Sequence, residues 1–156
     1  MNPGYRACLN DVRATTTADD SHADDHTSGV PAMTHVSGPD FLSVQVRDLP
    51  RSAGFYEREL GLQPMAGSPP GVVAFQTSPI PFAVREPLPG TDLDAGPAGL
   101  GVLLSLRADD VQELHDRLKT RGVPILTEPF DTPFGRSFVF QDPDGYAIAI
   151  HGATQD

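Results

Sequence analysis

The spacing of apolar and polar residues changes near residue 40 and is regular from there almost to the end of the chain. Residues 41–47 alternate between apolar and polar side chains, which predicts a strand that is buried on one face. Apolar residues then follow at helical spacing between Asp48, a favourable helix cap, and Gly61, a favourable helix end. The strands predicted after this helix lie near residues 62–66, 71–76 and 81–86. Together these elements form a β-α-β-β-β unit.

The same order of elements returns in the second half of the chain. A strand is predicted at 100–107, and a helix follows from Asp109 or Asp110 to Arg121. The remaining strands are predicted near 123–128, 136–141 and 146–151. The segments that align are 41–49 with 103–111, 73–76 with 138–141, and 82–85 with 148–151. We therefore expect an α+β domain at 41–152, made of two tandem βαβββ modules at 41–86 and 100–152.

The first forty residues have a different character. Residues 1–40 hold six Asp and two Arg and have almost no periodic apolar positions. Such a segment buries too little surface to offset its ordering entropy, so we expect a disordered tail. Its His22 and His26 are interpreted as solvated polar residues rather than metal ligands, because no framework holds them. Met33 is a plausible alternative start of the protein.

Composition and charge argue against several classes of function. Lys and Arg number 11 against 21 Asp and Glu, giving a net charge of −10, which disfavours nucleic acid and anionic membranes as partners. The longest apolar runs fall far short of the roughly 20 residues that span a bilayer. A single cysteine, Cys8, forms no intramolecular disulfide, and the N-terminus lacks the pattern of a secretory signal. We expect a soluble, cytoplasmic protein.

A further group of motifs surrounds the first helix and the last predicted turn. These motifs are Val46-Arg-Asp-Leu49, Ser52, Phe55-Tyr56, Leu60-Gly61 and Phe140-Gln-Asp-Pro-Asp-Gly145. The run 142–145 is typical of a tight turn in which Gly145 supplies a positive φ. With these motifs, residues 41–152 resemble the vicinal oxygen chelate superfamily, which includes glyoxalase I, bleomycin-resistance proteins and extradiol dioxygenases. The resemblance implies paired modules whose sheets curve around a cavity, with the helices outside.

The resemblance also implies where a metal would bind. Metal-dependent members hold a divalent ion with His, Glu or Gln on the first and last strands of each module. The corresponding positions in this chain carry Phe41, Ala83, Leu103 and Ala149, and none of these side chains coordinates a metal. We expect a protein without a metal or other cofactor.

The alternation of side chains along the strands predicts which residues face the cavity. The candidate ligand-binding residues are Phe41, Ser43, Gln45, Arg85, Leu103, Ser105, Arg107, Ala149 and His151. Arg47 is expected on the same face of the first strand. Arg85 and His151 suit recognition of a carboxylate, phenolate or carbonyl group, with solvated strand ends as the alternative. Gln45 either contacts the ligand or bonds to a neighbouring strand.

Aromatic residues near the second hairpin complete the list of candidates. Phe130 and Phe134 lie in a predicted loop at 130–135, where they either close over a ligand or pack beneath a hairpin. His115 on the second helix is interpreted as a surface histidine. No arrangement typical of a Ser-His-Asp or Cys-His nucleophile is present in the sequence.

Three functions remain open at this stage. The leading hypothesis is metal-independent binding of a small aromatic or antibiotic-like molecule, in sequestration or resistance. The first alternative is an enzyme of the same superfamily, a lyase, isomerase or dioxygenase with a non-standard site or a catalyst using His151 as acid or base. The second alternative is a dimeric structural or regulatory module. We also expect a homodimer, because helices on one side only leave sheet edges and cavity rims exposed.

Overall fold

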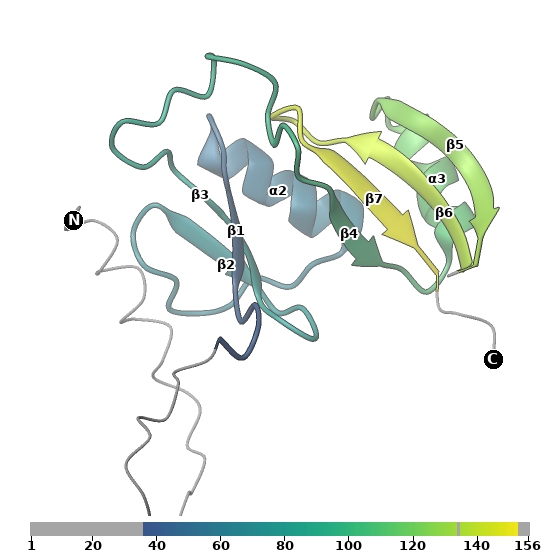
Figure 1. Cartoon of the computed structure of the whole chain (residues 1–156), viewed down its shortest axis with the longest axis horizontal. Coiled ribbons are helices and arrows are strands. Elements are labelled where there is room, and N and C mark those ends of the chain that lie inside the picture. Colours follow the sequence, from purple (N-terminus) through teal and green to yellow (C-terminus); the bar gives the residue numbers. More distant parts are fainter. Residues whose placement is uncertain (1–35, 134, 153–156) are drawn as a thin grey trace, which may run out of the picture. The chain divides into compact units, whose positions relative to one another are not determined.

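The computed structural model describes residues 36–133 and 135–152, and all its helices and strands lie within 41–152 (Figure 1). The first module contains β1 (Leu42–Gln45), α2 (Leu49–Leu60), β2 (Val72–Phe75) and β3 (Phe82–Arg85). The second module contains β4 (Leu104–Arg107), α3 (Val111–Thr120), β5 (Ile125–Thr132), β6 (Gly135–Gln141) and β7 (Ala147–His151). This order of elements confirms the α+β fold. The tail expected at 1–40 lies almost wholly outside the described residues.

The two modules form two mixed sheets with the same internal register. The first sheet has the order β1-β3-β2 and the second β4-β7-β6-β5. In both, the first strand runs parallel to the last, and Leu42 lies opposite Phe82 as Leu104 lies opposite Ile148. The internal repeat therefore extends to individual residue pairs. No described strand of one sheet pairs with a strand of the other, so the sheets are not closed on each other.

Both helices begin and end close to where their capping residues predict. The Asp48 carboxylate accepts a hydrogen bond from the Arg51 N–H at 3.0 Å, and α2 ends at Gly61 in the left-handed conformation, with φ 70°. The Asp110 carboxylate caps α3 in the same way, accepting from the Glu113 N–H at 2.9 Å. These local signals set the helix ends.

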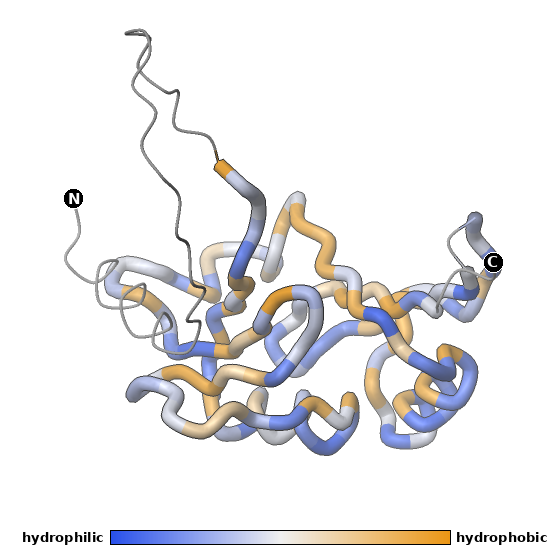
Figure 2. Tube along the Cα trace, turned by 90° about the horizontal axis from the view of Figure 1, so that it is seen from below, coloured by the Kyte–Doolittle hydropathy of each residue, from blue (hydrophilic) through white to orange (hydrophobic). Residues whose placement is uncertain are grey.

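Each sheet packs its helix through a separate apolar core. The first core contains Val46, Tyr56, Phe75, Phe82 and Val84. The second contains Val111, Leu114, Leu118, Phe138, Phe140, Ile148 and Ile150. Phe55, Leu60 and Leu104 pack against both cores. Figure 2 shows the apolar residues in short runs separated by polar ones, and no helix of the described chain is long and apolar enough to cross a membrane.

Two predicted elements differ from the structure. The strand expected at 62–66 is wrong: only an isolated bridge joins Pro64 to Phe75. Proline has no N–H to donate, so the ladder does not extend there. The loop expected at 130–135 is also wrong in its first half, because β5 continues to Thr132 and pairs Phe130 with Ser137 of β6.

His115 is buried, not a surface residue as expected, with a relative exposure of 3 %. Its Nδ1 lies 2.8 Å from Asp116 Oδ1, and its Nε2 lies 2.9 Å from Glu128 Oε2 in ion-pair rather than hydrogen-bond alignment. The ring also meets Phe138 edge-on, with centroids 5.3 Å apart. Strand β5 supplies Glu128, and the helical pattern alone contains no information about that neighbour.

Candidate functional site

A hollow of about 640 Å³ lies on the second sheet. It is lined by Leu103, Ser105, Arg107, Phe130, Thr132, Ser137, Val139, Ala149, His151 and Gly152. Along β6, the lining residues Ser137 and Val139 alternate with Phe138 and Phe140, which belong to the core beneath α3. The hollow therefore occupies the sheet face opposite α3, and its volume suits a small organic molecule.

The middle of the hollow is apolar and open. Val139 of β6 and Ala149 of β7 lie directly opposite each other in the sheet, and both are short enough to leave space above them. Leu103 and Phe130 also line the hollow and are 63 % and 45 % exposed. Large apolar side chains gathered around an open concavity are typical of a surface that a ligand or partner covers.

Polar groups gather at one end. Arg107 and His151 are directly opposite in the β4–β7 pair, and Ser137 lies opposite His151 on the other side. The His151 Nδ1 lies 3.0 Å from the Gly152 carbonyl oxygen, a hydrogen bond that requires the proton on Nδ1 and leaves Nε2 for another partner. The Ser137 hydroxyl donates to the Ile150 carbonyl at 2.7 Å.

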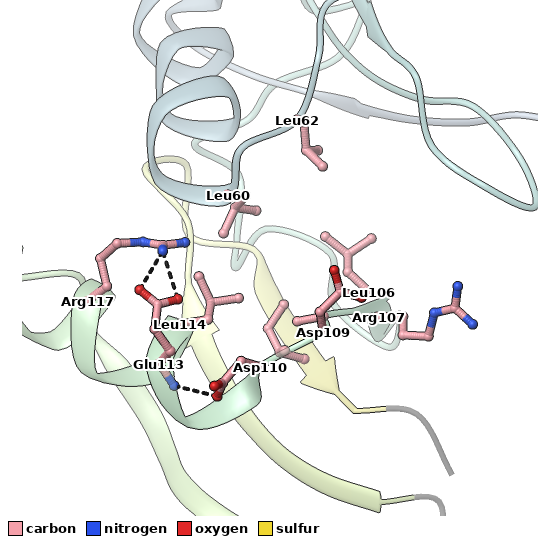
Figure 3. A pocket seen from close by; sticks show the side chains of 11 residues that line it. Leu60, Leu62, Leu106, Arg107, Asp109, Asp110, Glu113, Leu114 and Arg117 are labelled. Atoms are coloured by element: carbon pink, nitrogen blue, oxygen red, sulfur yellow. Dashed lines mark hydrogen bonds and ion pairs between the residues drawn. The ribbon is translucent and has the colours of Figure 1, made fainter. Parts of the chain in front are cut away.

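Arg107 supplies a positive charge to this end. Its side chain makes no ion pair with any residue in the part of the chain that the structure describes. Figure 3 shows it extending away from the neighbouring Asp109 and Asp110. A guanidinium beside an imidazole and hydroxyl groups is suited to bind a carboxylate or phenolate.

The structure brings together one half of the predicted site. The candidates of the second module that line the hollow are Leu103, Ser105, Arg107, Phe130, Ala149 and His151. The candidates of the first module, Phe41, Ser43, Gln45 and Arg85, do not line it. Phe134 lies outside the described residues. The hollow is also lined by residues that were not predicted, Thr132, Ser137, Val139 and Gly152. Alternation along the predicted strand 136–141 contained the signal for Ser137 and Val139.

Two polar residues of the first strand segment have structural partners instead. Gln45 Oε1 accepts a hydrogen bond from the Leu88 N–H at 2.6 Å, and the Gln45 carbonyl accepts from the Tyr146 hydroxyl at 2.8 Å. The expectation that Arg47 faces the cavity is wrong, because β1 ends at Gln45 and strand alternation stops there. The Arg47 side chain instead binds Asp94, at 2.8 Å, and the carbonyl oxygen of Asp144, at 3.0 Å.

The residues at the family's metal positions do not suit a metal ion. Phe41, Ala83, Leu103 and Ala149 offer only hydrocarbon side chains, and Ala83 is fully buried. Within 36–133 and 135–152, no three His, Cys, Asp or Glu residues are grouped so as to hold an ion. These four side chains therefore do not fit the metal ion of the metal-dependent members.

A smaller crevice of about 340 Å³ lies between the modules (Figure 3). Leu60, Leu62, Leu106 and Leu114 point into it from both modules. Part of its charged rim is engaged, since Glu113 binds Arg117 at 2.7 Å and the Asp110 carboxylate caps α3. Apolar walls that belong to the packing of the two modules are typical of a structural contact rather than a ligand site.

Comparisons with known proteins agree with this architecture. The family model of the glyoxalase/bleomycin resistance protein/dioxygenase superfamily matches residues 33–150. The phenazine antibiotic resistance protein EhpR of Enterobacter agglomerans is 26% identical over 129 residues, which are 76% of this chain and 97% of that protein.

Solved structures give the same result. TnmS3, an antibiotic binding protein from Streptomyces sp. CB03234, is 29% identical with a TM-score of 0.59, covering 79% of this chain and 98% of its own. Lactoylglutathione lyase from Agrobacterium tumefaciens shares the fold. It is 19% identical with a TM-score of 0.56, covering 76% of this chain and 96% of its own. The match to the family model, over most of the two modules, shows that this chain belongs to the glyoxalase/bleomycin resistance protein/dioxygenase superfamily.

Proposed function

We propose that this protein binds a small aromatic, antibiotic-like molecule in the hollow of the second sheet, without a metal, and so sequesters it. The observation that carries the proposal is the set of side chains around the hollow: short apolar residues at the floor, exposed Leu103 and Phe130 at the sides, and Arg107 with His151 at one end. The similarity to EhpR and TnmS3, named for antibiotic resistance and binding, supports the same class of ligand.

The energetics favour a flat ligand. A planar ring placed over Val139 and Ala149 contacts the floor without displacing a large side chain. Leu103 and Phe130 are 63 % and 45 % exposed, so covering each contributes about half of the roughly 1.5–3 kcal/mol that full burial of such a side chain gives. An acidic or phenolic edge on the ring would then meet the guanidinium of Arg107.

A second copy of the chain completes the proposed site. The segment leading into β4 exposes Leu100, Val102 and Leu103 at 82 %, 69 % and 63 %. Strand β4 is an edge of its sheet, so a partner chain can lie along it and close that side of the hollow. The compartment we propose is the cytoplasm, since a single cysteine leaves no intramolecular disulfide.

The experiment is a calorimetric titration with planar aromatic acids and phenazine-type compounds. Phe130→Ala is expected to weaken binding about tenfold by removing buried aromatic area, and Val139→Trp to abolish it by filling the hollow. Leu126→Ala is the matched control, because Leu126 lies on the same strand, is 51 % exposed and does not line the hollow. Binding that persists in Val139→Trp would contradict the proposal. Conversion of a bound compound, lost in His151→Gln, would favour the enzyme alternative.

A further inference from the structure

A groove separate from the hollow gathers much of the positive charge of this acidic protein. It has a volume of about 740 Å³ and lies between α2, the segment 121–124 and the turn 141–145. Four arginines line it, Arg47, Arg51, Arg58 and Arg121, although the chain carries a net charge of −10. None of its lining residues lines the hollow of the second sheet.

The four arginines differ in what they already bind. Arg47 is engaged with Asp94, Asp144 and the Leu93 carbonyl oxygen. The Arg121 Nη1 lies 3.7 Å from Glu59 Oε1, a long ion pair. The side chains of Arg51 and Arg58 make no ion pair or hydrogen bond with any residue of the described ranges.

The backbone of α2 places the guanidinium of Arg58 beside Gly54. A Cβ atom built on Gly54 would lie 2.5 Å from Arg58 Nη1 and 2.9 Å from Arg58 Cζ. The guanidinium therefore occupies the space that a side chain at position 54 would fill. Gly54 lies in the interior of α2, where glycine is less favourable than alanine. Because residues 51, 54 and 58 share one helix face, this position keeps the Arg58 guanidinium on the face that also carries Arg51.

The carboxylates of the groove have partners other than these two arginines. The Asp142 carboxylate accepts from the Tyr56 hydroxyl at 2.7 Å, and that of Asp144 accepts from the Ser52 hydroxyl at 2.6 Å; both side chains are buried. The carboxylate of Glu59 faces Arg121. Two like charges on one helix face, with no carboxylate of the described residues in ion-pair contact, favour an anion from solution.

We propose that this groove binds the phosphate or diphosphate group of a small molecule, with Arg51 and Arg58 as its principal contacts and Arg121 beside them. A planar guanidinium donates two parallel hydrogen bonds to an oxyanion, and two such forks match the several oxygens of a phosphate better than the two of a carboxylate. Phe55, which lines the groove on the same helix, offers an apolar surface to the organic part of a phosphate ester.

The test is calorimetric titration of the full-length protein with inorganic pyrophosphate, with sodium chloride at equal ionic strength as the reference. Arg51→Gln and Arg58→Gln are each expected to raise the Kd about tenfold or more, the loss typical of a charge-assisted hydrogen bond. Arg136→Gln is the matched control, because Arg136 is an exposed arginine that binds Asp131 and Gln112 outside the groove. Absence of saturable binding, or equal weakening in Arg136→Gln, would overturn the proposal.

Gly54→Ala gives a second variant that keeps every charge. Alanine favours the helix, but its Cβ must displace the Arg58 guanidinium, so pyrophosphate is expected to bind more weakly while α2 stays folded. If pyrophosphate binding is unchanged in Gly54→Ala while the circular dichroism of the helix is retained, the position of the Arg58 guanidinium beside Gly54 does not contribute to binding. Tighter binding of adenosine diphosphate than of pyrophosphate would assign the groove to a phosphate ester, and equal binding to free diphosphate.

Discussion

The Tyr56 hydroxyl donates a hydrogen bond of 2.7 Å to Asp142 Oδ2, joining the first helix to the last turn across 86 positions of sequence. Tyr56 is fully buried and Asp142 nearly so, and this burial raises the pKa of both groups. The other oxygen of the Asp142 carboxylate accepts from the N–H groups of Asp144 and Tyr146. One carboxylate therefore organises its own turn and attaches that turn to α2.

Replacing Tyr56 with phenylalanine is expected to lower the free energy of unfolding by about 1–3 kcal/mol, because a buried carboxylate oxygen loses its donor. Urea denaturation monitored by circular dichroism measures the change. Tyr146→Phe is the comparison, since it removes a hydroxyl that binds a backbone carbonyl in a less buried place, and its loss is expected to be smaller. An equal loss in both variants would contradict the special role of the Tyr56–Asp142 contact.

The turn itself depends on Gly145, whose φ is 97°. Gly145→Ala is expected to cost about 1–2 kcal/mol of stability, because a residue with a Cβ is strained at positive φ. The nearest atom to the new Cβ lies 3.7 Å away, so the cost is conformational rather than a clash. Gly96→Ala, at a position without positive φ and with open space around the Cβ, should leave the denaturation midpoint nearly unchanged.

The ion pairs around His115 predict a dependence of stability on pH. The hydrogen bond from Lys119 lowers the pKa of Glu128, and the bond to His115 lowers the pKa of Asp116. A carboxyl whose pKa is lower in the folded state contributes stability above its unfolded pKa and loses it as pH falls through the folded one. Stability should therefore decline below a pH of about 4.

Glu128→Gln is expected to flatten this acid decline in denaturant unfolding measured from pH 3 to pH 7. Asp142 acts in the opposite direction, because its raised pKa favours the protonated form in the folded protein and removes stability as pH rises. Glu57→Gln on the exposed side of α2 serves as the control. If stability falls as steeply with decreasing pH in Glu128→Gln as in the parent, the contact between Glu128 and its basic neighbours contributes little to the acid sensitivity.

The exposed apolar edge beside β4 predicts self-association. Sedimentation at micromolar concentration is expected to give a dimer, and Leu103→Glu to give a monomer with weakened aromatic ligand binding, because a charge there resists burial. Leu126→Glu, on an exposed residue of β5 outside the hollow, is the control. A parent protein that sediments as a monomer would contradict the predicted dimer.

The hydrocarbon side chains at the family's metal positions predict that chelators leave the melting temperature unchanged. The triple variant Phe41→His, Leu103→His, Ala149→Glu should bind a divalent metal more tightly than the parent, since it provides two histidines and a carboxylate. Leu103 and Ala149 line one hollow, whereas Phe41 belongs to the first module, so full coordination requires the two modules to face each other. One metal per chain in the parent, lost on changing His151, would overturn this prediction.

Local pattern was sufficient for most of the fold. Asp48 and Gly61 set the two ends of α2 through contacts within a few residues. Alternation along 103–107 and 147–151 placed Ser105, Ala149 and His151 on one face. The repeat was readable because equivalent pairs, such as Ser43 with Ala83 and Ser105 with Ala149, are the same residue types in both modules. These features depend on neighbours in sequence or on a period of two, and both are visible in the sequence.

The remaining features were decided by tertiary structure. Asp142 is buried because Tyr56 meets it across 86 positions, and His115 is buried because β5 brings Glu128 beside it. The candidates of the first module did not join the hollow, since which sheet faces enclose a common space depends on how whole modules pack. The sequence by itself determined both helices with their ends and the inward faces of β4, β6 and β7, but neither the absence of a strand at 62–66 nor the full length of β5. The partners of the buried polar groups depend on long-range packing, which no local pattern encodes.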